Sequence, residues 1–365
     1  MEAPIPFSSY PLPSDRSMRI GVLGAGFIVN DCHLVSYRKN GFNPVAIASR
    51  TRETAITVAE AHGISSVEAN YEAILERDDL DILDIAVPPD ATVPLILKAC
   101  AAGKVKGILA QKPLGMDYHQ ALQAVQACEA AGIVLAVNQN GRYDPSVRAG
   151  KELLDSGALG EPILGSIDMR AIPHWMPWQA EMGWVTLRIM SIHHLDMFRY
   201  WFGAPERIYA SARTDPRTTF PHRDGICAYV LEYANGLRAM SLDDTWTGPA
   251  REGAPAEIGI GWRIEGDQGW AIGDIGWCQD PYTSPSTLRY ARIGDADAIE
   301  PTLEGSWFPD AFGGTMGALM RTLETGETYG ISGRENLGTM ALVDAAYLSL
   351  ETRRAVEISE ITDRS

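Results

Sequence analysis

Two short stretches of the sequence hold side chains that can move a proton. The first is AQKPLG, residues 110–115, in which Lys112 directly precedes Pro113. A proline disfavours the helical conformation for the residue before it, so the backbone here is expected to be extended or turned and can direct the ammonium into a crevice. Lysine is a poor base at its usual pKa of about 10.4, but burial disfavours the charged form and can make it a general base near neutral pH. The alternative is a solvated surface lysine.

The second stretch is SIHHLD, which contains His193, His194 and Asp196 in a segment with helical spacing. Adjacent helical residues diverge by about 100°, so only one imidazole is expected to face a reacting atom. His193 and Asp196 are three residues apart and share a helix face, which allows the carboxylate to orient the imidazole. The alternative for either histidine is a hydrogen-bonded core residue. No zinc site is predicted, because no further ligand stands at a matching spacing.

A third motif, GVLGAGFIVN at residues 21–30, is typical of a turn that holds a pyrophosphate. Gly24 can make the tight turn after a strand, and Gly26 lets the backbone approach a phosphate at the start of a helix. Val29 stands where a third glycine usually eases helix packing. The predicted cofactor-binding residues of this turn are Gly24, Gly26, Phe27 and Ile28. The alternative is a glycine turn without a nucleotide.

The end of the next predicted strand favours NADP over NAD. The stretch AIASRTR has Ser49 and Arg50 where NAD-binding proteins often have a carboxylate for the ribose. Arg50 and Arg52 can pair with a 2′-phosphate. Arg50 can also stack on the adenine, which either cofactor permits.

The elements around these motifs indicate an α/β protein. From Met18 to about Asn138, short β-branched runs alternate with helical patterns, which predicts a Rossmann domain with a doubly wound parallel sheet. Ligands bind at the carboxyl ends of such strands, where Lys112 falls. The expected strands are at 19–23, 44–48, 82–87, 107–111 and 133–137, and the expected helices at 53–63, 91–103 and 117–132.

The rest of the chain predicts an α+β domain with a large, mostly antiparallel open sheet. Asn235-Gly236 separates two alternating runs, as a hairpin turn does, and residues 257–277 continue the pattern. The predicted domains are an irregular arm at 1–17, the Rossmann domain at 18–140, and a substrate-binding and oligomerisation domain at 141–365. Further helices are expected at about 145–156, 187–203, 309–325 and 334–354.

The composition of the chain indicates which kinds of binding partner and which compartment to expect. The chain has 365 residues and a net charge of −16, which disfavours nucleic acid and anionic membranes and favours a small molecule. Five scattered cysteines form no C-x-x-C pair, which indicates a reducing compartment. The segment before Met18 does not resemble a secretory signal, and no stretch of 18 apolar residues occurs. A cytoplasmic protein is expected.

A proline-broken stretch, IPHWMPWQAEMGW, contains Trp175, Trp178 and Trp184. Aromatic faces can cover a pyranose ring or close over a site, and Trp175 is the predicted substrate contact. Anchoring of a loop or a subunit contact is the alternative.

Taken together, these motifs resemble the glucose-fructose oxidoreductase, inositol dehydrogenase and rhizopine-catabolism (GFO/IDH/MocA) superfamily. The resemblance extends from Met18 to about Ile358. It implies an N-terminal Rossmann domain that binds NAD(P), and a C-terminal domain whose open sheet often forms a homodimer or homotetramer. It also implies oxidation or reduction of sugars, cyclitols and related polyols. The motifs that carry it are GVLGAGFI, AQKPLG, GRYDPSVRAGKELLDSGALGEPI, IHHLDMFRYWFG and GISGRENLGTMALVDAAYLSLETRRAVEI.

The resemblance assigns roles residue by residue. Lys112 matches the lysine of the family's Glu-Lys-Pro motif, which contacts the reacting hydroxyl, and His193 matches the histidine of its Asp-x-x-x-His motif. The sequence departs from the family where Gln111 replaces the glutamate beside the nicotinamide ribose and Ile189 replaces the aspartate. The predicted cofactor loop VPPDATVP, with Pro88, also lacks the usual histidine.

Arg142, Arg170 and Arg188 lie in motifs expected to border the crevice, and we hypothesise that one of them binds an anionic or strongly polar group of the substrate. A salt bridge within the second domain is the alternative. The predicted function is an NAD(P)-dependent dehydrogenase or reductase that acts on a secondary hydroxyl of a monosaccharide, glycoside, sugar acid or cyclitol, with Lys112 and His193 in proton transfer. The alternatives are a glycoside hydrolase that uses bound NAD for transient oxidation, and a non-catalytic nucleotide or sugar sensor.

Overall fold

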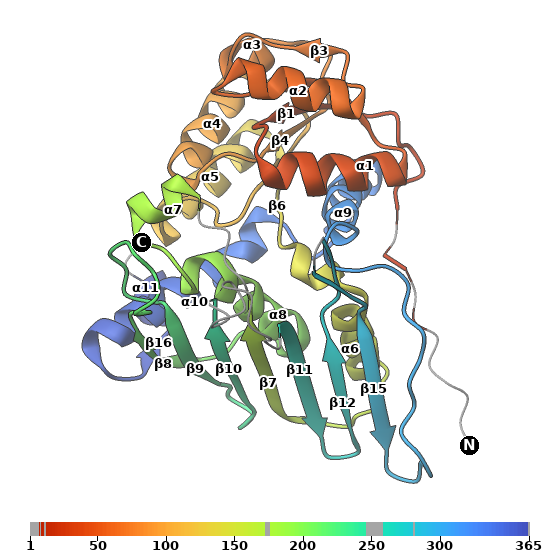
Figure 1. Cartoon of the computed structure of the whole chain (residues 1–365), viewed down its shortest axis with the longest axis vertical. Coiled ribbons are helices and arrows are strands. Elements are labelled where there is room, and N and C mark those ends of the chain that lie inside the picture. Colours follow the sequence, from red (N-terminus) through yellow and green to blue (C-terminus); the bar gives the residue numbers. More distant parts are fainter. Residues whose placement is uncertain are drawn as a thin grey trace. The chain divides into compact units, whose positions relative to one another are not determined.

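The structure is a computed structural model that describes residues 7, 9–10, 12–171, 176–245, 258–279 and 282–363, with the backbone alone at 278, 279, 282 and 283. The chain forms two compact units. The first, called the parallel-sheet unit here, comprises Tyr10–Tyr143 and Phe308–Met340. The second, the mixed-sheet unit, comprises Met1–Ser9, Asp144–Trp307 and Ala341–Ser365. Figure 1 labels the helices and strands of both.

The parallel-sheet unit contains six parallel strands in the order β3-β2-β1-β4-β5-β6. The strands are β1 (Arg19–Leu23), β2 (Asn43–Ala48), β3 (Ser66–Val67), β4 (Ile82–Ile85), β5 (Gly107–Ala110) and β6 (Val134–Val137). The helices are α1 (Leu34–Asn40), α2 (Arg52–His62), α3 (Tyr71–Leu75), α4 (Pro89–Ala102), α5 (Tyr118–Ala131) and α9 (Ala311–Thr325). A π-helical turn at Ile28–His33 leads into α1, and Asn140–Tyr143 form a 3₁₀ turn.

This arrangement confirms the predicted Rossmann fold. The five predicted strands and three predicted helices are present, and Gly63, Gly103 and Gly132 end the helices in the left-handed conformation. Such a helix end favours glycine because it has no Cβ. The short elements β3 and α3 were not predicted, because two and five residues are too few to show a period.

Helix α9 belongs to the parallel-sheet unit although it lies far along the chain. Its residues Met316, Leu319 and Met320 are buried in one apolar cluster with Ile20 of β1 and Leu109 of β5. The compact units therefore differ from the predicted ranges 18–140 and 141–365, because residues 308–340 bury their apolar side chains in the core of the first unit.

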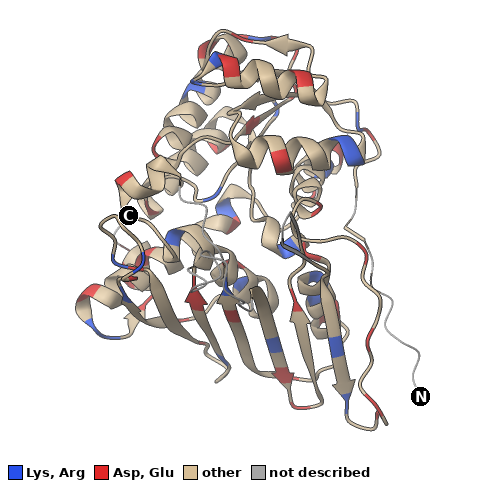
Figure 2. Ribbon diagram, viewed as in Figure 1, with Lys and Arg blue, Asp and Glu red and all other residues tan. Residues whose placement is uncertain are grey.

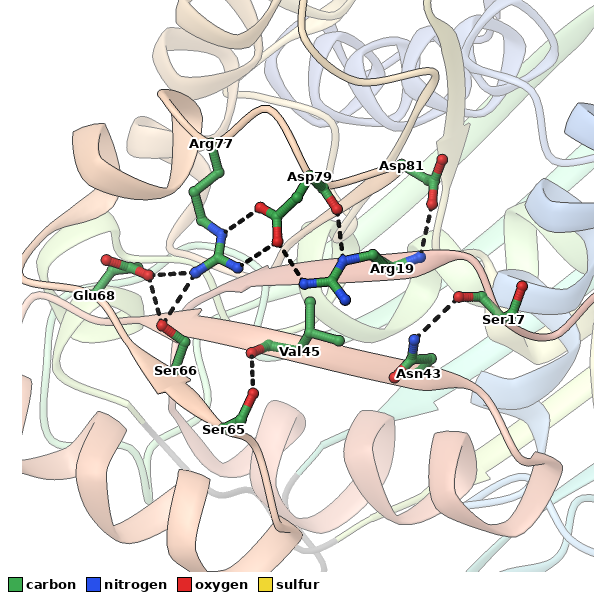
Figure 3. Close-up of polar contacts among 10 residues, drawn as sticks. All are labelled: Ser17, Arg19, Asn43, Val45, Ser65, Ser66, Glu68, Arg77, Asp79 and Asp81. Atoms are coloured by element: carbon green, nitrogen blue, oxygen red, sulfur yellow. Dashed lines mark hydrogen bonds and ion pairs between the residues drawn. The ribbon is translucent and has the colours of Figure 1, made fainter.

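Ion pairs around Arg77 and Arg19 join segments next to β1, β3 and β4 (Figure 3). Arg77 binds Asp79 through two hydrogen bonds of 2.8 and 2.9 Å and Glu68 through one of 2.6 Å. Arg19 also pairs with Asp79. Hydrogen bonds from Arg77 and Arg19 lower the pKa of Asp79 to about 2. The network ties Arg19 at the start of β1 and Asp79 before β4 to Glu68 just after β3, so it supports the sheet.

The mixed-sheet unit contains an eight-stranded sheet in the order β15-β12-β11-β7-β10-β9-β8-β16. Its pairs are antiparallel except for the parallel pair β7–β10, which confirms the predicted mostly antiparallel sheet. Asn235 and Gly236 turn between β9 and β10, as predicted. The strands are β7 (Pro162–Arg170), β8 (Arg207–Arg213), β9 (Ile226–Glu232), β10 (Arg238–Asp244), β11 (Gly259–Gly266), β12 (Gly269–Asp274), β15 (Thr287–Arg292) and β16 (Val356–Glu357). A separate two-stranded sheet pairs β13 (Trp277–Gln279) with β14 (Tyr282–Ser284).

One face of the eight-stranded sheet is covered by helices. Trp262 of β11 is buried against Trp201 of α8, and its indole nitrogen donates to the Ser146 hydroxyl of α6 at 3.0 Å. The helices of this unit are α6 (Pro145–Asp155), α7 (Pro177–Met182), α8 (Ile192–Phe202), preceded by a π-helical turn at Leu187–Ser191, and α11 (Ser359–Thr362). Helix α10 (Gly333–Thr352) contributes residues to both units.

The other face of that sheet presents apolar side chains. Tyr209, Met240 and Leu242 on β8 and β10 are 47%, 40% and 40% exposed. The strand register aligns Tyr209 with Val230 of β9 and Val230 with Met240. We call this row, together with Leu242, the outer apolar row. Such an apolar stretch on a sheet face is typical of an interaction surface.

Charged residues of both signs are distributed along both units (Figure 2). Within the described residues, no helix combines the length and apolarity needed to cross a bilayer. Cys32, Cys100, Cys128 and Cys227 are free thiols.

Candidate active site

The glycine turn after β1 has the geometry that the sequence predicts. Gly24 has a φ of +117°, and a Cβ there would lie 2.2 Å from the carbonyl oxygen of Ala86. Its amide donates to the carbonyl of Ala48 at 2.8 Å, which ties the turn to the end of β2. Gly26 is exposed, and a Cβ there would meet nothing within 4 Å. Gly24 is thus required by the fold, whereas Gly26 leaves its backbone open to a ligand.

Val29 fills the place of the third glycine without blocking the turn. Its side chain is fully buried in the core of the parallel-sheet unit. The helix there opens with the π-helical turn Ile28–His33, and the amides of Val29 and Asn30 both donate to the carbonyl of Gly26 at 3.0 Å. Phe27 and Ile28 are half-buried beside it.

The other predicted cofactor residues follow strands whose ends are in register. Leu23 is aligned with Ala48 and with Ile85, and Ile85 with Ala110. Ser49, Arg50, Pro88, Gln111 and Lys112 come directly after these strands, so one edge of the parallel sheet carries them all. The order of strands reverses between β1 and β4, where ligands bind in doubly wound sheets.

Lys112 lies on the turn after β5, and its peptide bond to Pro113 is cis. Desolvation lowers the pKa of its ammonium to about 7. By accessible surface the whole residue is half-buried. The lysine is therefore not the solvated surface residue of the alternative interpretation, and it has the pKa of a general base or acid at neutral pH.

Ser49 and Arg50 lie next to Tyr71 at the start of α3, a neighbour that sequence reasoning missed. Burial raises the pKa of the Tyr71 phenol, and hydrogen bonds from the Arg50 backbone and the Ser49 hydroxyl oppose that rise. Arg50 itself is exposed. A hollow of about 440 Å³ adjoins Gly26 and Phe27 and also borders Asp31, Glu53 and Thr54. The strand end thus offers an exposed cation beside a hydroxyl, and the carboxylates of Asp31 and Glu53 border the nearby hollow.

A buried polar cluster lies behind the glycine turn and was also missed. His33 Nδ1 lies 2.7 Å from Asp84 Oδ2, and the Tyr37 hydroxyl donates to the same oxygen at 2.8 Å. His33 Nε2 lies 2.9 Å from Asn138 Nδ2 and 3.2 Å from Gln111 Nε2. His33, Tyr37 and Asp84 are fully buried. Its only sequence signal was a histidine and an aspartate in apolar elements, which does not reveal that they meet.

In the mixed-sheet unit, the two adjacent histidines have different surroundings. Nδ1 of His194 lies 3.0 Å from Asp243 Oδ1, and both residues are fully buried between α8 and β10. His193 is 3% exposed and packs edge-on against Trp307, with ring centroids 5.1 Å apart. Asp196 is buried on the same helix. Asp243 thus holds the imidazole of His194, a pairing that the sequence does not reveal.

The three arginines each pair with a carboxylate of their own unit. Arg142 donates to both oxygens of Glu335 at 3.0 and 3.1 Å and to the carbonyl of Gly330 at 2.6 Å. Arg170 lies 2.7 Å from Asp168.

Arg188 lies 2.5 Å from Asp344 and is 6% exposed. Trp184 and Tyr347 flank its guanidinium, at 4.9 and 5.1 Å from the ring centroids. Trp184 therefore serves as an anchor for this arginine. Ile189 and Trp178 are half-buried, and Trp175 lies outside the described residues.

A glycine turn, a helix start and a desolvated lysine at the carboxyl edge of a doubly wound sheet define a dinucleotide-binding oxidoreductase. Two family models match the chain: "Oxidoreductase family, NAD-binding Rossmann fold" at residues 18–139 and "GFO/IDH/MocA C-terminal domain" at residues 147–272. The chain belongs to the GFO/IDH/MocA family. It is an NAD(P)-dependent oxidoreductase of the class that acts on CH–OH groups.

Several characterised relatives are similar over nearly the whole chain. D-apiose dehydrogenase of Paraburkholderia graminis is 27% identical, covering 93% of this chain and 89% of that protein. D-xylose 1-dehydrogenase (NADP(+)) 2 of Haloferax volcanii is 27% identical, covering 93% and 100%. Among solved structures, levoglucosan dehydrogenase in complex with NADH and L-sorbose has a TM-score of 0.81 at 18% identity, covering 94% of this chain and 99% of that one, which supports the same fold.

Proposed function

We propose that this protein is a dehydrogenase or reductase acting on a secondary hydroxyl of a monosaccharide, glycoside, sugar acid or cyclitol. The observation that carries the proposal is Lys112, whose pKa is lowered to about 7 on the turn after β5. The named relatives act on D-apiose and D-xylose, which fits a sugar or polyol as substrate.

The residues at the carboxyl edge of the parallel sheet fit a nicotinamide dinucleotide. Gly26 and the amides at the start of the π-helical turn suit the pyrophosphate, and the segment after β2 suits the adenosine ribose. Pro88 and Gln111 would line the nicotinamide half. When bound, the cofactor accepts a hydride in oxidation and donates one in reduction.

Lys112 would take the hydroxyl proton of the substrate during oxidation. Its amine would thereby become an ammonium that holds the proton beside the oxygen of the new carbonyl. In reduction Lys112 returns the proton to the carbonyl oxygen. His193 is the proposed second contact to that oxygen or its neighbour, because His194 is engaged by Asp243. A pair of this kind typically contributes about 10²- to 10⁴-fold in rate.

We further propose that NADP is preferred over NAD and that two copies associate through the mixed sheet. Arg50 is exposed beside Ser49 and can pair with a 2′-phosphate. The outer apolar row offers a surface that a second copy of this chain can cover.

A substrate screen tests the activity. Sugars, sugar acids and cyclitols are offered with both cofactors in both directions, and the reduced-nicotinamide absorbance is followed. We expect net formation of reduced cofactor with at least one polyol, and its loss in Lys112→Met with cofactor binding retained. Glycoside cleavage without net reduction of the cofactor would indicate a hydrolase. Cofactor binding without any turnover would indicate a sensor.

A further inference from the structure

The buried cluster around His33 fixes where that imidazole carries its proton. Nδ1 faces Asp84 Oδ2 at 2.7 Å, and a carboxylate accepts there, so Nδ1 carries the proton. Nε2 faces the amide nitrogens of Asn138 and Gln111 at 2.9 and 3.2 Å, and amide nitrogens are donors. Nε2 therefore accepts, and a second proton on it would point at two donors.

The orientation of the Gln111 amide follows from its other neighbour. The backbone N–H of Lys112 donates to Gln111 Oε1 at 2.8 Å, which leaves Nε2 of Gln111 as the atom that faces His33. The backbone amide of Gln111 in turn donates to the carbonyl of Ile85 at 2.9 Å. A continuous set of hydrogen bonds thus runs from Asp84 through His33 and Gln111 to the backbone of Lys112.

We propose that the Asp84–His33 pair is a positioning element for the proton-transfer lysine, and that it requires an amide rather than a carboxylate at residue 111. This inference rests on the proposed role of Lys112 as the proton acceptor. His33 is enclosed by Asp84 of β4, Tyr37 of α1, Gln111 after β5, Asn138 after β6, and Phe312 of α9, whose ring centroid lies 5.2 Å from that of His33. Asp84 and Tyr37 are the titratable groups among them.

The charges around Asp84 and His33 explain why residue 111 needs to be an amide rather than a carboxylate. His33 and Tyr37 both contact Oδ2 of the Asp84 carboxylate, and its Oδ1 is buried without a partner among the described residues. A buried carboxylate of this kind attracts a further positive charge. The two amide donors at Nε2 oppose a second proton on the imidazole. A glutamate at residue 111 would replace one donor with an acceptor, and the imidazole would then gain that proton.

The variant Gln111→Glu tests the proposal. We expect nitrogen NMR of the wild-type imidazole to show a protonated Nδ1 and an unprotonated Nε2 for His33, and both nitrogens protonated at pH 7 in the variant. The added carboxylate lies one residue from Lys112 and stabilises its charged form, so the pH limb of the oxidation rate should move upward by about one unit. The rate at pH 7 should fall about fivefold.

Gln120→Glu is the matched control. Gln120 lies in the first turn of α5, and its Oε1 accepts from the backbone amide of Met116 at 3.1 Å. The variant adds the same charge just after the segment that carries Lys112, and we expect His33 to keep an unprotonated Nε2 and the pH limb to move much less. An equal displacement in both variants would overturn the proposal, as would a Gln111→Glu protein in which Nε2 of His33 stays unprotonated or the pH limb stays in place.

A second variant applies if Gln111→Glu does not fold. Asp84→Asn keeps the size of the side chain but removes the carboxylate charge that faces Nδ1 of His33, so kcat should fall several-fold with cofactor affinity unchanged. An unchanged kcat would overturn the proposal. Failure of the proposed function has a different signature: Lys112→Met would retain turnover, while His33 would still gain its second proton in Gln111→Glu.

Discussion

Arg188 and Asp344 form an ion pair at 2.5 Å whose guanidinium is flanked by the rings of Trp184 and Tyr347. Tyr347 in turn donates to Asp224 at 2.8 Å, and Asp224 accepts from the backbone amides of residues 185–187. The cation is therefore balanced inside the mixed-sheet unit and holds the segment that leads into α8.

Replacing Arg188 should lower the stability of the protein and leave its preference between neutral and anionic substrates unchanged. Breaking a buried ion pair leaves an uncompensated charge, and Arg188→Ala should lower the free energy of unfolding by about 3 kcal/mol. Turnover of neutral sugars and of sugar acids or sulfonates should fall by the same factor. Arg223→Ala, which breaks the exposed pair with Glu351, is the control and should change stability by about 0.5 kcal/mol or less. A loss confined to anionic substrates would instead assign Arg188 to the substrate.

The pH dependence of turnover should report the lowered pKa of Lys112, about 7. Oxidation needs the neutral amine, so kcat/KM should rise about tenfold per pH unit below pH 7 and level off above it. Reduction needs the ammonium, and its rate should decline above the same pH. Initial rates in both directions measure this. Lys112→Arg, which stays charged, should lose at least about 10²-fold in oxidation. A rate independent of pH across this range would contradict the role.

Substitution of Gly24 should affect the stability of the fold, whereas substitution of Gly26 should affect cofactor binding. Gly24→Ala places a Cβ against the Ala86 carbonyl at a positive φ and should destabilise the parallel-sheet unit. Gly26→Ala meets no protein atom within 4 Å, so its melting temperature should match that of the wild type. Its cofactor dissociation constant, measured by fluorescence titration, should rise at least about tenfold because the methyl occupies the path of the pyrophosphate. Unchanged cofactor affinity in Gly26→Ala would place the pyrophosphate elsewhere.

Cofactor preference should depend on Arg50. Loss of a charge-assisted contact to the 2′-phosphate typically costs about 1.5–3 kcal/mol, so Arg50→Ala should weaken NADPH binding about tenfold or more and NADH binding little. The ratio of the two dissociation constants is the measurement. Arg38→Ala, whose side chain donates to the carbonyl of Ala61, is a control for loss of a positive charge elsewhere in the parallel-sheet unit. Equal weakening of both cofactors by Arg50→Ala would indicate adenine stacking instead.

Association through the mixed sheet should depend on the outer apolar row. Met240→Glu places a carboxylate in the middle of that row, beside Val230, and should shift the protein to a monomer in light scattering. Ile293→Glu changes an isolated, 75% exposed side chain outside the row and should not. A wild-type monomer, or a Met240→Glu variant that stays associated, would exclude this surface.

The sequence predicted what depends on local pattern. The alternation of strand and helix patterns, with glycines at the helix ends, was enough to predict a set of parallel strands. In the structure, these strands end side by side at Leu23, Ala48, Ile85 and Ala110. The position of Lys112 at that edge followed from the order of elements alone, because all parallel strands point the same way.

What it did not predict are pairings between distant residues. His33 meets Asp84 from 51 positions away and Asn138 from 105, and His194 meets Asp243 from 49. Each of these residues lies in an apolar element, where its type alone does not name a partner. The same holds for α9, whose apolar face fits several surfaces until the sheet beside it is known.

Each unit is built from separate segments of the chain, so its folding depends on residues that are synthesised late. The parallel-sheet unit needs Phe308–Met340, and the mixed-sheet unit needs Ala341–Ser365. A ribosome must therefore release almost the entire polypeptide before either core is complete, and a premature stop after residue 307 would deprive both units of a segment at once.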